Sequence, residues 1–160
     1  EYVDGQLPVL LLATMPYWTQ LRRFLAESYF TVESVERIVS DECVGYAGTY
    51  DLLGPLHENN WESDIRDLID VKTGSVPRTV GAQTMAYARC LPGGIGVIRR
   101  WCLRLTPECY RLVPLNVKAS GRVDHAIDRY DERLFTAAAT VAAFRRQYQS
   151  SVESVACPTS

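Results

Sequence analysis

The sequence predicts an α+β domain built around a small, mainly antiparallel sheet. The first observation is a pair of alternating apolar and polar runs over residues 97–118, a pattern typical of a β-hairpin, on which we expect the sheet to be centred. The second is helical spacing of apolar residues over three further stretches, which predicts helices that pack on this sheet. These helices are expected at about 16–29, 61–72 and 123–149.

Length and composition indicate one globular domain. The chain has 160 residues, of which 47% are hydrophobic and 22% charged, a balance typical of folded proteins. We expect a single domain over residues 1–150 and a C-terminal tail over residues 151–160. The apolar runs are shorter than about 20 residues, so no membrane span is expected.

The N-terminal region is expected to contain a strand, a helix and a second strand. A continuous apolar run at Val9–Ala13 predicts a buried strand, and Pro16 suits the first turn of the following helix. β-branched residues favour a strand over Val35–Ser40, although a helix that starts near Thr31 stays open.

The middle of the chain alternates breakers with short periodic stretches. Glycine and proline predict an irregular segment over Gly45–Asn60, and Asn60 suits the N-cap of the helix at 61–72. Ala82–Cys90 fits either a strand or a helical turn. Three aspartates spaced three apart on the helix at 61–72 predict a solvated acidic edge: Asp64, Asp67 and Asp70.

The C-terminal helix has the strongest pattern in the chain. Its apolar residues lie along one face, and acidic residues such as Asp124 and Asp128 crowd its first turns. Arg145 and Arg146 lie in its last turns, so the charges complement the helix dipole at both ends.

The hairpin arms place two cysteines and several arginines close together. If Cys102 faces Cys109, Arg100 faces Arg111, and Arg104 lies on the same face. The opposite face is then mostly apolar and should pack on the core.

The arginine face is the candidate binding site, formed by Arg100, Arg104 and Arg111. Like charges directly opposite each other destabilise a strand pair by up to about 1 kcal/mol unless an anion relieves the repulsion. One interpretation is that it binds a carboxylate or phosphate of a partner or ligand. The alternative is a patch that is neutralised within the chain by acidic residues of the C-terminal helix, for instance Asp128, Asp131 or Glu132, or that is simply left in solvent.

The five cysteines leave the redox state open. An odd number means that at least one thiol is free or pairs with another chain. A disulfide between Cys102 and Cys109 and a pair of reduced thiols are equally compatible with the sequence. The spacing of Cys90 from these two does not match a zinc knuckle, so no metal site is expected.

Catalytic and cofactor signatures are missing from the sequence. His57 and His125 do not form an H-E-x-x-H motif, and Lys72-Thr73-Gly74 follows no S-x-x-K motif. Gly93–Gly96 does not complete the dinucleotide-binding pattern. We therefore predict no catalytic residues, no metal and no cofactor.

One weak family resemblance covers the first forty or so residues. The strand at Val9–Ala13, the helix led by Pro16, the strand at Val35–Ser40 and the following Asp41-Glu42 resemble the first β-α-β unit of nucleotide-sugar glycosyltransferases. The resemblance implies a nucleotide pocket at the carboxyl end of the first strand, lined by Asp41 or Glu42. The D-x-D metal motif of many such enzymes does not occur.

Together these observations predict a non-catalytic protein–protein interaction or structural module, such as an accessory subunit of a larger complex. Arginine and aromatic residues, which are enriched in interfaces, are plentiful. The net charge of −2 predicts no nucleic-acid partner. The alternatives are a small or degenerate glycosyltransferase-like enzyme and a secreted, disulfide-stabilised binding protein. A chain that begins at Glu1 is compatible with a processed organellar or secreted protein, so the compartment stays open.

Overall fold

The computed structural model describes residues 13–56 and 65–155, with side chains described up to residue 146. These ranges contain three helices and five strands. The order is α1 (Met15–Glu27), β1 (Ser34–Asp41), β2 (Tyr46–Gly54), β3 (Arg66–Lys72), α2 (Val80–Arg89), β4 (Ile98–Leu105), β5 (Tyr110–Pro114) and α3 (His125–Val155). The predicted α+β class is confirmed.

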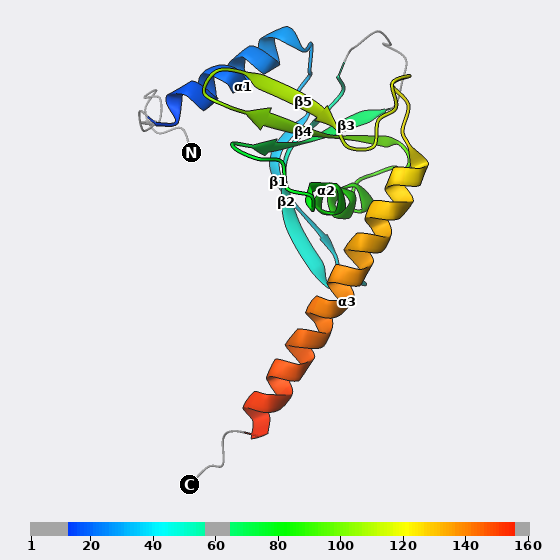
Figure 1. Cartoon of the computed structure of the whole chain (residues 1–160). Helices are drawn as coiled ribbons and strands as arrows, with labels where there is room; N and C mark the ends of the chain where they lie inside the picture. The colour runs from blue at the N-terminus through cyan, green and yellow to red at the C-terminus, as the bar shows by residue number, and fades with distance from the viewer. Residues whose placement is uncertain (1–12, 57–64, 156–160) are drawn as a thin grey trace.

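The five strands form one open sheet in the order β1-β2-β3-β4-β5 (Figure 1). Three neighbouring pairs are antiparallel, and β3 and β4 are parallel. Parallel strands need a crossover connection, and α2 supplies it between β3 and β4. The sheet is therefore mainly antiparallel, as predicted; the predicted hairpin supplies β4 and β5, and β3 lies in the middle.

Helices cover both faces of the sheet. Phe24 of α1 packs with Ile69 and Leu103 on one face, while Tyr87 of α2 packs with Leu68 on the other. α3 packs beside α2 and then extends away from the body of the molecule (Figure 1). The strands β3 and β4 are thus buried between two helical layers.

The helix predicted over 61–72 is wrong for residues 66–72, which form β3. Leu68 and Ile69 are both fully buried and belong to the clusters on opposite faces of the sheet. A strand covered on both faces has a continuous apolar run, and a short run of this kind also fits helical spacing. Residues 57–64 lie outside the described ranges.

The irregular segment predicted over 45–60 is also wrong in its first part, because Tyr46–Gly54 forms β2. Glycine serves close packing here rather than a turn. A Cβ atom on Gly54 would lie 1.9 Å from the carbonyl oxygen of Thr31, so a side chain there would force the two segments apart.

The other predicted elements agree more closely with the structure. α1 confirms the N-terminal helix, β1 confirms the strand at 35–40, and the open choice at 82–90 resolves to α2. α3 extends to Val155, so the tail predicted from residue 151 is helical over its first five residues. The strand predicted at Val9–Ala13 lies outside the described residues up to position 12, and Ala13 lies in a turn.

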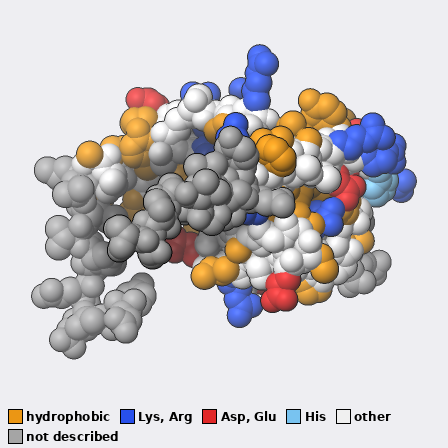
Figure 2. Space-filling model, turned by 90° about the horizontal axis from the view of Figure 1, so that it is seen from below, with side chains coloured by type: hydrophobic (Ala, Val, Ile, Leu, Met, Phe, Trp, Pro, Cys, Tyr) orange, Lys and Arg blue, Asp and Glu red, His pale blue; other side chains and the backbone are white. Residues whose placement is uncertain are grey.

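The β-α-β unit implied by the glycosyltransferase resemblance therefore lacks a described first strand. β1 lies at the edge of the described sheet and pairs antiparallel with β2. In the described part of the chain, no helix is long and apolar enough to cross a membrane. On the face shown in Figure 2, hydrophobic, basic and acidic side chains are interspersed.

Candidate functional site

The β4–β5 hairpin pairs in a register four residues away from the predicted one. Leu105 pairs with Tyr110, and Cys102 pairs with Val113 instead of Cys109. The loop explains the difference, because the Thr106 hydroxyl accepts a hydrogen bond from the Cys109 amide at 3.1 Å and donates one to its carbonyl at 3.0 Å. An even shift keeps each side chain on its predicted face of the hairpin.

Of the two predicted states, a Cys102–Cys109 disulfide and reduced thiols, the structure has the reduced thiols. Cys43, Cys90, Cys102 and Cys109 are all free. Burial, followed by the charge of Asp70, raises the pKa of the Cys102 thiol to about 11. This thiol is protonated at neutral pH, which makes it a poor nucleophile.

Arg100, the first arginine of the candidate patch, is enclosed within the chain. Only 1% of it is exposed, and its Nη2 lies 2.8 Å from Asp128 Oδ1 and 2.9 Å from Asp131 Oδ2. Its Nη1 donates to the carbonyl of Gly81 at 2.6 Å. The sequence analysis named Asp128, Asp131 and Glu132 as candidate partners of the arginines, and the first two of them bind Arg100.

Gly81 allows this ionic cluster to form. A Cβ atom at this position would lie 2.7 Å from both carboxylate oxygens of Asp131, so glycine lets α3 approach the start of α2 closely. Asn116 completes the cluster: its Oδ1 accepts from the Arg100 amide at 2.6 Å, and its Nδ2 donates to Asp128 at 2.8 Å.

Arg104 and Arg111 remain exposed and lie directly opposite each other in the β4–β5 ladder. On the other side of Arg104, the parallel register places Lys72 of β3. We call Lys72, Arg104 and Arg111 the cationic row, because residues paired across a sheet point to the same face. Arg104 Nε donates to the carbonyl of Gly74 at 2.8 Å, which holds the side chain near the end of β3.

The solvated acidic edge predicted from the aspartates is wrong for Asp67 and Asp70, which are both buried in β3. Asp67 accepts hydrogen bonds from Arg99 at 2.6 and 2.7 Å, from the Trp101 indole at 2.6 Å and from the Leu56 amide at 2.8 Å. Such a number of internal donors identifies Asp67 as a structural anchor. Asp64 lies outside the described residues.

Asp70 has different surroundings at the carboxyl end of the same strand. Its Oδ2 lies 2.6 Å from Lys72 Nζ. Asp51 of β2 reaches across to this end, because its Oδ2 accepts the amide of Val71 at 2.6 Å. The charge of Asp51 acts on both Asp70 and Lys72, so the two carboxylates and the ammonium group lie close together at this end of the strand. We call Asp51 and Asp70 the acidic pair.

The environment perturbs both partners of the Asp70–Lys72 ion pair. Burial raises the pKa of the Asp70 carboxyl, and the charge of Asp51 adds to this effect, while Lys72 opposes it. For Lys72, burial lowers the pKa, but Asp70 and then Asp51 outweigh it, so the pKa is raised. Lys72 thus keeps its charge at neutral pH beside a carboxylate that is costly to ionise.

A cavity of about 240 Å³ borders this region at Asp51. It is lined by Leu21, Val35, Glu36, Asp51, Leu52 and Val71. Asp51 is therefore partly accessible, whereas Asp70 lies deeper with 3% exposure. Leu52 and Val71 point to the face of the sheet that α1 covers, so the cavity touches Asp51, whereas Asp70 and Lys72 point to the other face.

Metal-binding residues are few in the described ranges, which contain no group of three or more His, Cys, Asp or Glu side chains suited to hold a metal ion. The acidic pair offers two carboxylates, a number that suits Mg²⁺ when substrate phosphates complete its coordination. His125 lies exposed at the start of α3, and His57 is outside the described residues.

The sequence analysis did not select Asp51 and did not assign chemistry to Asp70 or Lys72. The available signal was Asp70-Val71-Lys72 at the end of the apolar run Leu68-Ile69, together with Asp51 in a second strand. No protein-family model matches the chain, and no curated protein has significant sequence similarity to it.

Proposed function

We propose that this protein hydrolyses phosphodiester bonds in nucleic acid with the help of a divalent cation. The observation that carries this proposal is the meeting of Asp51, Asp70 and Lys72 at the end of β3. Titratable groups whose pKa is raised and that have a defined charge partner are common at functional sites.

The acidic pair supports binding of Mg²⁺ or Mn²⁺. Hard divalent cations prefer carboxylate oxygens, and Mg²⁺ commonly takes one or two of them together with substrate phosphates. Burial raises the pKa of Asp70 and so makes its ionisation costly. A bound cation would offset this cost. When bound, such a cation activates water and neutralises charge on the phosphate.

Lys72 supports phosphoryl chemistry at the same point. Its ammonium group is held 2.6 Å from Asp70, and its raised pKa keeps it charged. A fixed ammonium beside the phosphate stabilises the negative charge that develops in the transition state. We therefore assign Lys72 to electrostatic stabilisation and the acidic pair to binding of the cation.

The cationic row supports a polyanionic substrate. Arg104 and Arg111 repel each other across the ladder, and phosphate groups would relieve this repulsion. A nucleic-acid strand carries one negative charge per nucleotide, so successive phosphates suit a row of cations that leads to Lys72. The net charge of −2 averages over the chain and does not reflect this local arrangement.

Cleavage of labelled oligonucleotides, single-stranded and double-stranded, tests the proposal. We expect cleavage with Mg²⁺ or Mn²⁺, none with a chelator, and loss of cleavage in Asp51→Asn and Asp70→Asn. Glu108→Gln is the matched control, because it removes an exposed carboxylate from the hairpin loop. Cleavage that persists in Asp70→Asn, or that needs no cation, would refute the proposal.

Calorimetric titration with Mn²⁺ gives a readout that does not depend on knowing the substrate. We expect one site in the wild type and in Glu108→Gln, and weaker or absent binding in Asp70→Asn. Equal Mn²⁺ binding by the wild type and Asp70→Asn would place the cation elsewhere and contradict the assignment.

A second candidate function is the non-catalytic interaction or structural module, such as an accessory subunit. Large apolar side chains exposed on α3 support it, among them Tyr130 at 67% and Phe144 at 68%. Light scattering on protein purified from its source without denaturant separates the candidates. A large stable complex would support the subunit function, and a particle of 18.0 kDa would count against it.

A further inference from the structure

α3 carries an apolar stripe that stays exposed in the described structure. Its members recur at alternating intervals of three and four residues: Ile127, Tyr130, Leu134, Ala137, Val141 and Phe144. The five large members are 39–68% exposed. Over these residues the stripe is about 26 Å long, which is more than scattered surface apolar residues provide.

The side of α3 that contacts the body lies about a third of a turn around the helix from the stripe. Asp128 and Asp131 bind Arg100, and the ring of Phe135 packs against Tyr46 with ring centroids 5.0 Å apart. These three contacts do not involve a member of the stripe. The stripe is available for a separate contact.

The spacing of the stripe selects a helix as its partner. Alternating intervals of three and four residues are the a and d positions of a heptad, which keep an apolar seam facing another helix. α1 and α2 have 13 and 10 residues and pack on the sheet, so they do not match the seam. A second copy of α3, with 31 residues, does.

Side-chain size and charge favour an antiparallel pair. With the two-fold axis at residue 139, Leu134 faces Phe144 and Ala137 faces Val141 of the second copy, so each layer across Ala137 combines a small residue with a larger one. A parallel pair would stack Ala137 on itself and bring Arg145 and Arg146 of both copies together. The antiparallel pair separates the two Arg145 positions by about 18 Å along the axis, beyond the screening length of about 8 Å.

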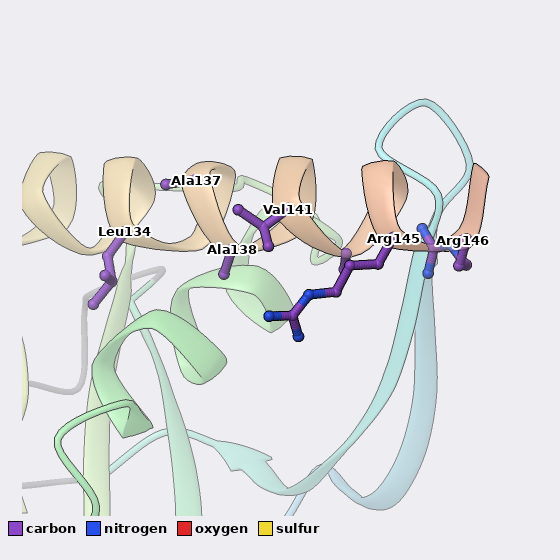
Figure 3. Close-up of a pocket in the computed structure, with 7 residues that line it drawn as sticks. Leu134, Ala137, Ala138, Val141, Arg145 and Arg146 are labelled. Carbon is purple, nitrogen blue, oxygen red and sulfur yellow. The ribbon is translucent and has the colours of Figure 1, made fainter. Parts of the chain in front are cut away.

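A groove of about 600 Å³ runs beside the stripe (Figure 3). It is lined by Leu134, Ala137, Ala138, Val141, Ala142, Arg145 and Arg146. Its three alanines leave room for a helix to approach closely, and side chains of that helix would fill the groove.

We propose that the chain forms a homodimer in which two copies of α3 pair antiparallel along this stripe. The proposal is independent of the phosphodiesterase function, since the stripe includes none of Asp51, Asp70 and the cationic row.

The mass of the full chain in solution tests the dimer. We expect the wild type at twice the 18.0 kDa of one chain, and Val141→Glu at 18.0 kDa with unchanged circular dichroism. Ala143→Glu is the matched control, because it adds the same charge to the same turn outside the seam, and it should stay dimeric. A monomeric wild type, or a Val141→Glu variant that remains dimeric, would overturn the proposal.

Cross-linking tests the orientation, with the parent chain treated in parallel to account for the native thiols. Mixing Ala137→Cys with Val141→Cys should give a new disulfide-linked dimer in the mixture that neither variant forms alone. Efficient cross-linking of each variant with itself would indicate a parallel pair and overturn the antiparallel arrangement.

Discussion

Two ionic clusters of this protein use similar residues in opposite ways. Around Arg100, one cation and two aspartates are enclosed by β4, α2 and α3. At the end of β3, one cation and two aspartates lie together, and Asp51 and Lys72 of this open cluster are partly exposed to solvent. Enclosure makes the first cluster a tie between the sheet and α3, whereas access to solvent makes the second a candidate for chemistry.

Two arginines of β4, Arg100 and Arg104, differ in the same way. Arg100 and Arg104 are four residues apart and face the same way, yet Arg100 is 1% exposed and Arg104 is exposed. The difference arises from α3, which covers β4 at Arg100 and supplies both carboxylates. Position relative to the helical layer, rather than residue type, decides which arginine is free to bind an anion.

The largest effect should come from removing Arg100, the cation of the enclosed cluster that it forms with Asp128 and Asp131. Arg100→Met leaves Asp128 and Asp131 buried without their cation, and we expect a loss of about 3–5 kcal/mol in the free energy of unfolding. Denaturant titration measures it. Arg104→Met is the control on the same face and should change stability by about 1 kcal/mol or less, since it removes only an exposed charge that faces Arg111.

If Arg100→Met does not fold, the triple variant Arg100→Met, Asp128→Asn, Asp131→Asn keeps the test open. It removes all three charges, so it should be more stable than the single variant. Equal losses in Arg100→Met and Arg104→Met would contradict the distinction between the two arginines.

The second-largest effect should come from removing Lys72, the cation of the open cluster that it forms with Asp51 and Asp70. We expect Lys72→Ala to lower the turnover number for oligonucleotide cleavage by roughly 10²–10³-fold, since one fixed donor to the developing charge is lost. Denaturant titration of the same variant should show a loss of about 1–3 kcal/mol, because the buried Asp70 loses its charge partner. A large stability loss with unchanged cleavage would assign Lys72 a structural role.

The sequence predicted the fold class and the long C-terminal helix because both depend on apolar periodicity. It misassigned β3 because Leu68 and Ile69 face opposite helical layers, and such a run has no strand alternation. The error also concealed the site. In a helix Asp70 and Lys72 would lie about 200° apart, whereas in a strand they share a face.

The arginine site shows a different limit of prediction. The faces of the hairpin were predicted correctly although the register was not, because a shift of four residues preserves side-chain alternation. The partners of each arginine could not be chosen from the sequence, since they depend on where α3 crosses β4. Asp128 and Asp131 were identified only as one of two alternatives, and the approach of α3 at Gly81 settles their role for Arg100.

A smaller effect is expected from the exposed arginines. Arg111→Gln should weaken binding of an uncleaved oligonucleotide, measured with the inactive Asp70→Asn chain, and reduce the slope of log affinity against log salt by about 1. The same change removes the repulsion between Arg104 and Arg111, so stability should rise by up to about 1 kcal/mol. Arg129→Gln, on the exposed surface of α3, is the control and should leave the salt slope unchanged.

The smallest effect is the pH dependence of stability that comes from Asp70. Burial raises its folded-state pKa above the ordinary value of 3.8, so the folded protein holds this proton more tightly than the unfolded chain does. The resulting stabilisation is complete below 3.8 and is lost as the pH rises through the folded-state pKa. Asp70→Asn should lack this decline, so the difference in unfolding free energy between variant and wild type should grow in favour of the variant over that range.

Mn²⁺ should reverse the decline in the wild type alone, because a cation bound by the acidic pair stabilises the ionised carboxylate. Parallel pH profiles for the two proteins would show that Asp70 ionises freely, and the contrast between the open and the enclosed cluster would then rest on access to solvent alone.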